Sequence, residues 1–425
     1  MSHASTLAPE LATEVPGPRS RALAERLRAV ESRNVTCLEP EPPIFWERAS
    51  GANVWDVDGN RYVDLGGAFA VANVGHAHPR VVEAVADQAG RLLHGMGDVH
   101  PPAVKVELLE ALAARFPGGE PARAVLGSSG ADAVEAALET AALATGRAGA
   151  VAFEGAYHGL SLGALDATSR ADFRDPFAAR LPHATVFARY GDAEDVRRAA
   201  REARVPVGAV LVEPVQGRGG VRVPPPGFLR ALRRLCDAEG WVLVADEIFT
   251  GCGRTGRFFA CEREGVVPDV LCIGKGLASG MPISACVGRA EVMDAWPLSR
   301  GEALHTQTFL GHPPSCAAAL ASLAALDQEG LVARSEALGA EALELLGRRA
   351  ADLPGVKEVR GLGLMLGIEC DAPERAARAV GRALRRGLIL LPSGHDGRVL
   401  SITPPLTIER AVFLAALEEL CACLA

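Results

Sequence analysis

Two charged side chains of this sequence stand directly after apolar segments, where a charge usually needs a partner. Asp246 ends the run WVLVAD, and Lys275 follows the run VLCI between Gly274 and Gly276. An unpaired buried charge is costly, and ligands of open α/β sheets bind where the carboxyl ends of the strands meet. We therefore expect both charges at one rim of a sheet. They could form a simple salt bridge, but the bare backbone around Lys275 also lets a bulky group approach its amine.

A glycine- and serine-rich turn offers a site for a phosphate group. In VLGSSGADAVEAALETA (125–141), a predicted strand turns through Gly-Ser-Ser-Gly into a predicted helix. The free amides and the dipole of a helix N-terminus bind anions. The pattern is common and weak by itself. It matches neither GxGxxG nor GxxxxGKS/T, which disfavours dinucleotide and Walker-type sites.

An aromatic residue and a histidine follow in the loop EGAYHGLS (154–161), at Tyr157 and His158. This is either a plain surface loop or an aromatic face on which a planar ligand lies. Together with the lysine, the aspartate and the turn, it matches pyridoxal 5′-phosphate (PLP). That cofactor needs an amine for its aldehyde, a phosphate cup, a stacking partner and a carboxylate beside its ring nitrogen. Lys275 would bind the aldehyde as an imine, and its glycine neighbours would leave room for the ring.

The composition is that of an ordinary globular protein and disfavours several classes of partner. The chain has 425 residues, 49% hydrophobic and 23% charged, with a net charge of −8. No stretch combines lysine and arginine with aromatics, so we expect no nucleic-acid partner. The ten cysteines include no CxxC pair, which argues against a metal site. No apolar signal core opens the sequence and the alanine-rich segment 315–326 is too short for a bilayer, so we expect a soluble cytoplasmic protein without a membrane partner.

The elements that must position these side chains follow from the hydrophobic pattern. From about residue 66, apolar segments alternate with amphipathic ones, which predicts a parallel sheet covered by helices. The predicted strands of this part are 122–126, 149–153, 184–187, 207–212 and 241–245. Its predicted helices are 79–93, 103–115, 130–145, 227–239 and 313–327.

The two ends of the chain are expected to differ from this central part. Residues 1–20 should be flexible and 21–33 helical, and 45–65 reads as two strands joined by an Asp-Gly-Asn turn. After a long helix, 330–352, the pattern predicts strands 356–360, 363–369, 388–391 and 398–403 and helices 372–386 and 407–424. We therefore divide the chain into an N-terminal segment (1–66), a large domain (67–325) and a small C-terminal domain (326–425).

The longest motif resembles the class III aminotransferases of PLP fold type I, which include 4-aminobutyrate, ornithine and acetylornithine aminotransferases. The motif is ADEIFTGCGRTGRFFACEREGVVPDVLCIGKGLASGMPISA (245–285), supported by VEPVQGRGG (212–220), RGLGLMLGIE (360–369) and TPPLTIE (403–409). The resemblance extends from about residue 40 to 415. It implies an α/β fold, with a mostly parallel seven-stranded sheet in the large domain. A smaller α+β domain would be built from the C-terminus and the N-terminal segment.

The resemblance implies roles in the cofactor chemistry. Lys275 would hold the cofactor aldehyde, be displaced by the incoming amine and then transfer the proton of the substrate carbon. Asp246 would keep the ring nitrogen protonated, and His158 would hydrogen-bond this aspartate. Tyr157 and Ile248 would pack against the two faces of the ring.

The resemblance also implies how the phosphate is bound. Ser129, Gly130 and Ala131 match the phosphate-binding turn of the family. Thr308, in HTQTFLGHP (305–313), matches a threonine that family members donate to the phosphate of the partner subunit. The chain is therefore expected to form a homodimer with shared active sites.

Among the departures from the family pattern, one lies near the cofactor ring and two bear on the substrate. Phe249 replaces a glutamine near the cofactor ring, while Leu160 and Ser401 replace arginines for the two carboxylates of family substrates. Arg398 would face the opposite side of its strand and cannot substitute for the second arginine. A missing arginine–carboxylate pair should weaken binding by roughly a few kcal/mol, so a short ω-amino acid is disfavoured as donor.

The expected pocket also includes Phe69 and Glu213. Glu213 matches the glutamate that pairs with the missing arginine in the family. It could instead face an arginine of its own segment, Arg218 or Arg222, or a cationic group of the substrate. Apolar walls at Phe69 and position 160 favour a hydrophobic or polyamine-like donor.

The predicted function is the transfer of an amino group from a primary amine or ω-amino donor to a 2-oxo acid, by a ping-pong mechanism at Lys275. The arginine that binds the oxo acid is not identifiable from the sequence. Two alternatives remain: an amino acid racemase or epimerase on the same scaffold, and a non-catalytic α/β binding protein. A racemase would convert one enantiomer without any oxo acid, and a binding protein would take up no cofactor at the lysine.

Overall fold

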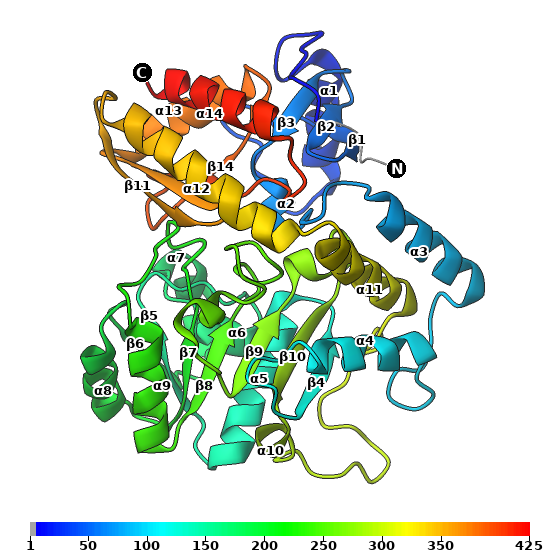
Figure 1. Ribbon diagram of the computed structural model, residues 1–425, viewed down its shortest axis with the longest axis vertical. Helices are drawn as coiled ribbons and strands as arrows, with labels where there is room; N and C mark the ends of the chain where they lie inside the picture. The colour runs from blue at the N-terminus through cyan, green and yellow to red at the C-terminus, as the bar shows by residue number, and fades with distance from the viewer. Residues whose placement is uncertain (1–5) are drawn as a thin grey trace.

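A seven-stranded sheet lies at the centre of the computed structural model, which describes residues 6–425 (Figure 1). All neighbouring strands of this sheet are parallel except the two pairs that contain β10. The expected mostly parallel α/β sheet is therefore confirmed. In sheet order the strands are β4 (Ala122–Gly127), β10 (Ser284–Arg289), β9 (Val270–Ile273), β8 (Val242–Asp246), β7 (Val207–Val212), β5 (Gly149–Phe153) and β6 (Thr185–Ala188).

Helices cover both faces of this sheet, which explains why its strands are continuously apolar. Along β8, Val242 and Val244 share one core with α5, whereas Leu243 and Ala245 belong to the core of the other face. On that other face, α9 packs on β7 and β8, and α8 on β5 and β6. The helices of this part are α3 (Pro79–Arg91), α4 (Ala103–Ala113), α5 (Gly130–Thr145), α6 (Leu162–Asp166), α7 (Ala171–Arg174), α8 (Ala193–Glu202), α9 (Phe228–Glu239), α10 (Ala290–Met293) and α11 (Pro313–Gln328), with the 3-10 helices η1 (Asp175–Arg180), η2 (Ala260–Glu264) and η3 (Lys275–Leu277).

Two smaller sheets lie together at one end of the molecule, where Figure 1 shows the N-terminal and C-terminal elements side by side. The C-terminal sheet is antiparallel and has the order β11 (Val356–Leu362), β12 (Met365–Cys370), β15 (Val399–Ile402), β14 (Leu391–Ser393). The N-terminal sheet has the order β1 (Trp46–Ser50), β2 (Asn53–Asp56), β3 (Arg61–Asp64), β13 (Leu388–Ile389). The helices of this end are α1 (Pro18–Val30), α2 (Gly67–Ala70), α12 (Leu331–Ala350), α13 (Pro373–Leu384) and α14 (Arg410–Leu424).

Two strand predictions were wrong in detail. Segment 45–65 forms three strands, because a second turn at Gly51, with φ of 58°, separates β1 from β2. The predicted strand 388–391 splits between two sheets: β13 pairs in parallel with β3, and β14 pairs antiparallel with β15. The short C-terminal strand β13 thus completes the N-terminal sheet. The two domain boundaries drawn from the sequence, after residues 66 and 325, stay a prediction.

The N-terminal stretch is more ordered than expected over residues 6–17. The amides of Ala12 and Thr13 donate hydrogen bonds to the Asn60 side chain at 2.8 and 2.9 Å, and Glu10 pairs with Arg61 through backbone bonds. These contacts hold the stretch against the N-terminal sheet. Residues 1–5, also part of the predicted flexible start, lie outside the described residues.

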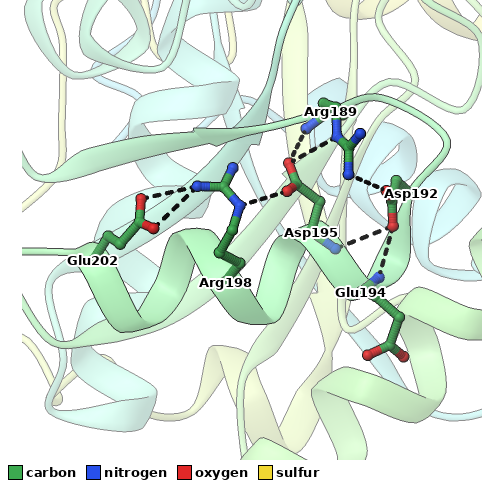
Figure 2. A network of polar contacts seen from close by, with 6 residues as sticks. All are labelled: Arg189, Asp192, Glu194, Asp195, Arg198 and Glu202. Atoms are coloured by element: carbon green, nitrogen blue, oxygen red, sulfur yellow. Dashed lines mark hydrogen bonds and ion pairs between the residues drawn. The ribbon is translucent and has the colours of Figure 1, made fainter.

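A polar network fixes the junction between β6 and α8 (Figure 2). Asp192 caps the helix by accepting hydrogen bonds from the amides of Glu194 and Asp195, both at 3.1 Å. Asp195 accepts from the Arg189 amide and from Arg198 Nε, each at 2.7 Å. The hydrogen bond from Arg198 is the largest cause that lowers the pKa of Asp195, to about 2. The network anchors the edge of the large sheet to its covering helix.

The helices and polar side chains of residues 6–425 bear on two kinds of partner, membranes and metal ions. No single helix is long and apolar enough to cross a membrane, and only α11 and α12 taken together, bent by 63°, pass by length and composition. The described residues contain no group of three or more His, Cys, Asp or Glu side chains that could hold a metal ion.

Candidate active site

The carboxyl ends of β8 and β9 open into a cavity of about 320 Å³. Asp246 is the last residue of β8, and Lys275 follows β9 after one glycine. The apolar strands thus place both charges at one rim, as an open α/β sheet requires. The predicted residues that line this cavity are Ser129, Gly130, Ala131, Tyr157, His158, Leu160, Glu213, Asp246, Ile248 and Lys275.

A larger cavity of about 570 Å³ adjoins the first, and the two share Arg218 and Phe249. Phe69 and Ser401, the other two predicted pocket residues, line this larger cavity. β14 and the loop after it, residues 391–397, form one wall, so the site lies between the large sheet and the C-terminal sheet. Thr308 lines neither cavity and is exposed in the segment before α11.

Lys275 adopts a backbone conformation that residues with a side chain rarely adopt, with φ of 40°. Such strain is concentrated at functional positions. Its Nζ lies 4.5 Å from the centroid of the Phe249 ring. Burial lowers the pKa of Lys275 and outweighs the opposing charges of Asp246 and Glu213. A lysine with a lowered pKa has a larger neutral fraction, which is the form that attacks an aldehyde.

The two glycines beside the lysine serve different purposes. A Cβ at Gly276 would lie 3.0 Å from carbon atoms of the Asn73 side chain, so this glycine allows close packing. A Cβ at Gly274 would make only ordinary contacts at 3.6 Å, for example with Ile248. Gly276 thus has a packing reason of its own, and the expectation that both glycines leave room for a cofactor ring stays a prediction.

Asp246 is held in place by the loop that carries the predicted aromatic residue. His158 Nδ1 lies 2.7 Å from Asp246 Oδ2, and the Ile248 amide donates to Asp246 Oδ1 at 3.1 Å. Both side chains of the histidine–aspartate pair are buried. Burial acts to lower the pKa of His158. The hydrogen bond to Asp246 and the charge of Asp246 together raise this pKa by more than burial lowers it, so the net shift is upward. A carboxylate oriented in this way can stabilise a protonated ring nitrogen.

The N-terminus of α5 provides the anion site that the Gly-Ser-Ser-Gly turn indicates. The Ser129 hydroxyl accepts from the Asp132 amide at 3.3 Å, and the Asp132 carboxylate accepts from the Ser129 amide at 3.0 Å. The next two amides, of Gly130 and Ala131, donate to no other residue that the structure describes. Unpaired amides at a helix N-terminus bind phosphate groups. A Cβ at Gly130 would lie 3.0 Å from Ile248, so only glycine fits there without a shift.

Glu213 forms no ion pair with Arg218 or Arg222, which were one of the alternatives considered for it, and is bound by backbone amides instead. Its carboxylate accepts hydrogen bonds from the Gly217 amide at 3.1 Å and the Tyr157 amide at 3.2 Å. It makes no ion pair with an arginine of the described chain. Burial raises the pKa of Glu213 to about 7. This carboxyl group connects the two loops that border the cavity.

Arg218 is the cavity residue whose position the sequence did not reveal. Its guanidinium carbon lies 4.9 Å from the centroid of the Tyr157 ring and 5.8 Å from that of the Phe173 ring. A signal was present, because this arginine, like Lys275, stands beside a glycine shortly after an apolar strand. Phe249 departs from the family pattern in the sequence, but nothing in the sequence indicates its contact with Lys275.

The residues of the smaller cavity fit PLP. An amine of lowered pKa, two unpaired amides beside a serine hydroxyl, a fixed carboxylate and a tyrosine ring all line one space. Lys275 would hold the aldehyde, Ser129, Gly130 and Ala131 the phosphate, and Asp246 the ring nitrogen. Each chemical group of the cofactor therefore has a suitable partner in this chain.

Comparison with known proteins decides the family, because the model of the family "Aminotransferase class-III" matches residues 37–424. The chain belongs to the class III aminotransferases. It is similar to 5-aminovalerate aminotransferase DavT of Pseudomonas aeruginosa, with 38% identity covering 95% of this chain and 98% of the relative. The acetylornithine aminotransferase of Methanopyrus kandleri is 40% identical, covering 89% of this chain and 93% of the relative.

A solved structure agrees with this membership. The ornithine aminotransferase of Toxoplasma gondii superimposes with a TM-score of 0.87 at 31% identity, covering 95% of this chain and 94% of that one. A second structure of that enzyme has PLP at its active site in part of the molecules. This class III aminotransferase is a PLP-dependent enzyme of fold type I that catalyses transamination. Neither the racemase nor the non-catalytic binding protein is favoured.

Proposed function

We infer that this class III aminotransferase uses a primary amine of hydrophobic or elongated shape as donor and a 2-oxo acid as acceptor. The observation that carries the inference is the convergence of three features in one cavity. These are the Lys275 amine, the His158–Asp246 pair and the unpaired amides of α5. Class III aminotransferases are generally dimeric and use amine and oxo-acid substrates.

The chain's own residues perform the binding and the proton transfers. PLP, when bound, takes up the electrons of the bond that breaks at the substrate carbon. Asp246 holds the positive charge of the ring nitrogen, and His158 keeps this carboxylate oriented. The Lys275 amine takes the proton from the substrate carbon that bears the amino group. Its lowered pKa leaves a neutral nitrogen available for that step.

A lysine substitution tests the assignment of the reacting amine. In Lys275→Ala, borohydride reduction should incorporate no cofactor covalently and transamination should be lost, because no amine remains at the rim of the sheet. Lys357→Ala is the matched control, since Lys357 is exposed on β11. It should behave as the wild type in mass spectrometry and in activity assays. Covalent cofactor on Lys275→Ala would disprove the assignment.

The donor class follows from the walls of the larger cavity. Phe69, Leu391 and Pro392 line it, and Leu160 stands at the smaller one. The names of the relatives also point to donors with a terminal amine, such as 5-aminovalerate. We expect hexylamine and putrescine to react faster than 4-aminobutyrate with pyruvate or 2-oxoglutarate as acceptor. A large preference for 4-aminobutyrate would contradict this part of the proposal.

The proposed homodimer shares its active sites through Thr308. This residue is exposed, and its neighbour Gln307 contacts Ser128 Oγ at 2.7 Å beside the phosphate turn. Mixed dimers of Lys275→Ala and Thr308→Ala subunits test the sharing. If the threonine acts in trans, the one lysine-containing site of the mixed dimer has an intact threonine and binds PLP as tightly as the wild type. If that site keeps the weak affinity of the Thr308→Ala homodimer, the threonine does not act in trans.

A further inference from the structure

The wall between the two cavities contains an arginine without an anionic partner. Arg218 and Phe249 are the residues common to both cavities, so a molecule that extends from Lys275 into the larger cavity passes them. The Arg218 side chain is exposed to this space. Its position allows contact with a substrate whose reacting carbon lies at the lysine.

The charges of the larger cavity are balanced except at this residue. Arg170 pairs with Asp172 at 2.6 Å, and Asp396 accepts from Arg398 Nε at 2.8 Å. Arg218 makes neither an ion pair nor a side-chain hydrogen bond with any residue from 6 to 425. An unpaired guanidinium in a cavity attracts an anionic group of a ligand.

Aromatic rings hold the guanidinium in place without occupying its hydrogen-bond donors. The rings of Tyr157 and Phe173 pack edge to face, with centroids 5.7 Å apart, and the arginine lies over both. Stacking uses the flat face of a guanidinium and leaves its N–H groups free in the plane. The backbone is fixed as well, because the Gly394 amide donates to the Arg218 carbonyl at 2.9 Å. The parallel N–H donors of the guanidinium, which form a fork, are thus preorganised to bind the two oxygens of a carboxylate.

The residues at the two positions where the family has arginines, and the arginine nearest to them in the sequence, cannot bind a substrate carboxylate in place of Arg218. Leu160 and Ser401 carry no charge, and Arg398 is engaged by Asp396 and lines neither cavity. The donor inferred above needs no carboxylate, whereas the acceptor always has one. We propose that Arg218 binds the carboxylate of the 2-oxo acid acceptor and thereby determines acceptor specificity. This assignment rests on the proposed function, since it assumes a transamination in two halves.

Equilibrium binding to the holoenzyme tests the assignment without relying on turnover. The probe is glutarate, a dicarboxylate with neither an amine nor a keto group, and glutaramide is its uncharged counterpart. Isothermal titration calorimetry should show at least about tenfold weaker glutarate binding in Arg218→Gln and a smaller loss in Arg218→Lys, which keeps the charge but not the fork. Arg222→Gln, an exposed arginine of the same loop that lines neither cavity, should bind within twofold of the wild type. Glutaramide binding should not change in any variant.

The kinetics of the two half-reactions provide an independent test of the assignment. In Arg218→Gln, the KM for pyruvate and for 2-oxoglutarate should rise at least about tenfold, because the acceptor loses a charge-assisted bidentate bond. The single-turnover reaction with hexylamine, followed by the cofactor absorbance without any acceptor, should stay within twofold of the wild type. The same single-turnover reaction with 5-aminovalerate shows whether Arg218 binds the carboxylate of the donor or that of the acceptor. If only the reaction with 5-aminovalerate is impaired in Arg218→Gln, the arginine binds the donor and the assignment is wrong.

The remaining outcomes are also decisive. Unchanged glutarate affinity and unchanged KM values in Arg218→Gln would overturn the assignment, and so would an equal loss in Arg222→Gln. Loss of the cofactor from Arg218→Gln would overturn it too, because the guanidinium would then belong to the cofactor site. A wild-type holoenzyme that reacts with no amine would instead disprove the proposed function, and glutarate binding would still report on Arg218.

Discussion

Glu213 shows how one buried side chain makes the stability of this enzyme depend on pH. Its two oxygens accept from backbone amides, yet burial raises its pKa to about 7, against the opposing charge of His158. The usual value is 4.5. Between these two values the folded protein holds a proton that the unfolded chain has released. Folding stability should therefore fall as the pH rises through this window.

Replacement of Glu213 by glutamine should remove this dependence. A shift from 4.5 to about 7 corresponds to at most about 3 kcal/mol, so the wild type should lose up to that amount relative to Glu213→Gln between pH 4.5 and 7.5. Urea unfolding of both apoenzymes across this range provides the measurement. Glu154→Gln, at an exposed carboxylate, should show no such divergence. Parallel curves for wild type and Glu213→Gln would contradict the prediction.

At the scale of the element, α2 is a single left-handed turn that forms part of the pocket. The φ angles of Gly67, Ala68, Phe69 and Ala70 are 54°, 49°, 62° and 62°. Left-handed helical conformation costs about 1–2 kcal/mol per residue with a side chain. The turn is held at its start by Asp64, which accepts from the amides of residues 66 and 68 at 2.9 and 3.0 Å. The strained turn presents Phe69, with 60% of its surface exposed, to the larger cavity.

The strain at Phe69 can be measured with two variants that both lack the ring. Phe69→Gly should be more stable than Phe69→Ala by about 1 kcal/mol, because only glycine adopts this conformation without a steric cost. Chemical denaturation of the two apoenzymes gives the difference. At an ordinary helical position alanine would be the more stable of the two. The order of the two variants therefore decides whether the left-handed turn is present in solution.

The network at the start of α8 carries a second prediction at this scale. The low pKa of Asp195, about 2, means that its ionised form stabilises the fold above the unfolded value of 3.8. Asp195→Asn should lower the melting temperature at pH 7, and the difference should shrink as the pH falls from about 4 towards 2. Glu194→Gln is the control, because the Glu194 side chain is exposed and pairs only with Arg197 among the residues described. A difference that is independent of pH would exclude the charge of Asp195 as the cause.

At the scale of the whole molecule, the sequence specified some elements better than others for a physical reason. β8 and the apolar run that forms β9 were recognisable because both faces of each strand are buried, so each appears as an unbroken apolar run with a functional charge at its end or two residues beyond it. The run 388–391 is equally apolar, yet its halves pair with β3 and β15, which lie far apart in the chain. No local pattern marks the residue at which a chain passes from one sheet to another. The unpaired state of Arg218 escaped prediction for the same reason, since it depends on the partners chosen by distant residues.

One fully buried cation lies at the junction between the large sheet and the smaller sheets. Arg254 donates from its guanidinium to the Asn73 side chain at 3.0 Å, to the Leu364 carbonyl at 3.0 Å and to the Pro404 carbonyl. Its own carbonyl accepts from Ser335 Oγ at 2.9 Å. Only 1% of its surface is exposed, and this burial lowers the pKa of Arg254 to about 9. The residue thus connects the segment after β8 with both ends of the chain.

Arg254→Met should weaken this junction more than it weakens the large sheet. Three buried acceptors would lose their donor, at about 1–3 kcal/mol each, so the free energy of unfolding should fall by about 3 kcal/mol or more. Amide hydrogen exchange should become faster in β12 and β15, which flank the lost contacts, while β7 and β8 keep their protection. Arg257→Met, at an exposed arginine close by, should change neither quantity. Equal loss of protection in all four strands would contradict the prediction, because the arginine would then stabilise the whole fold as one cooperative unit. The large sheet and the C-terminal sheet, which enclose the active site, would in that case unfold together and not separately.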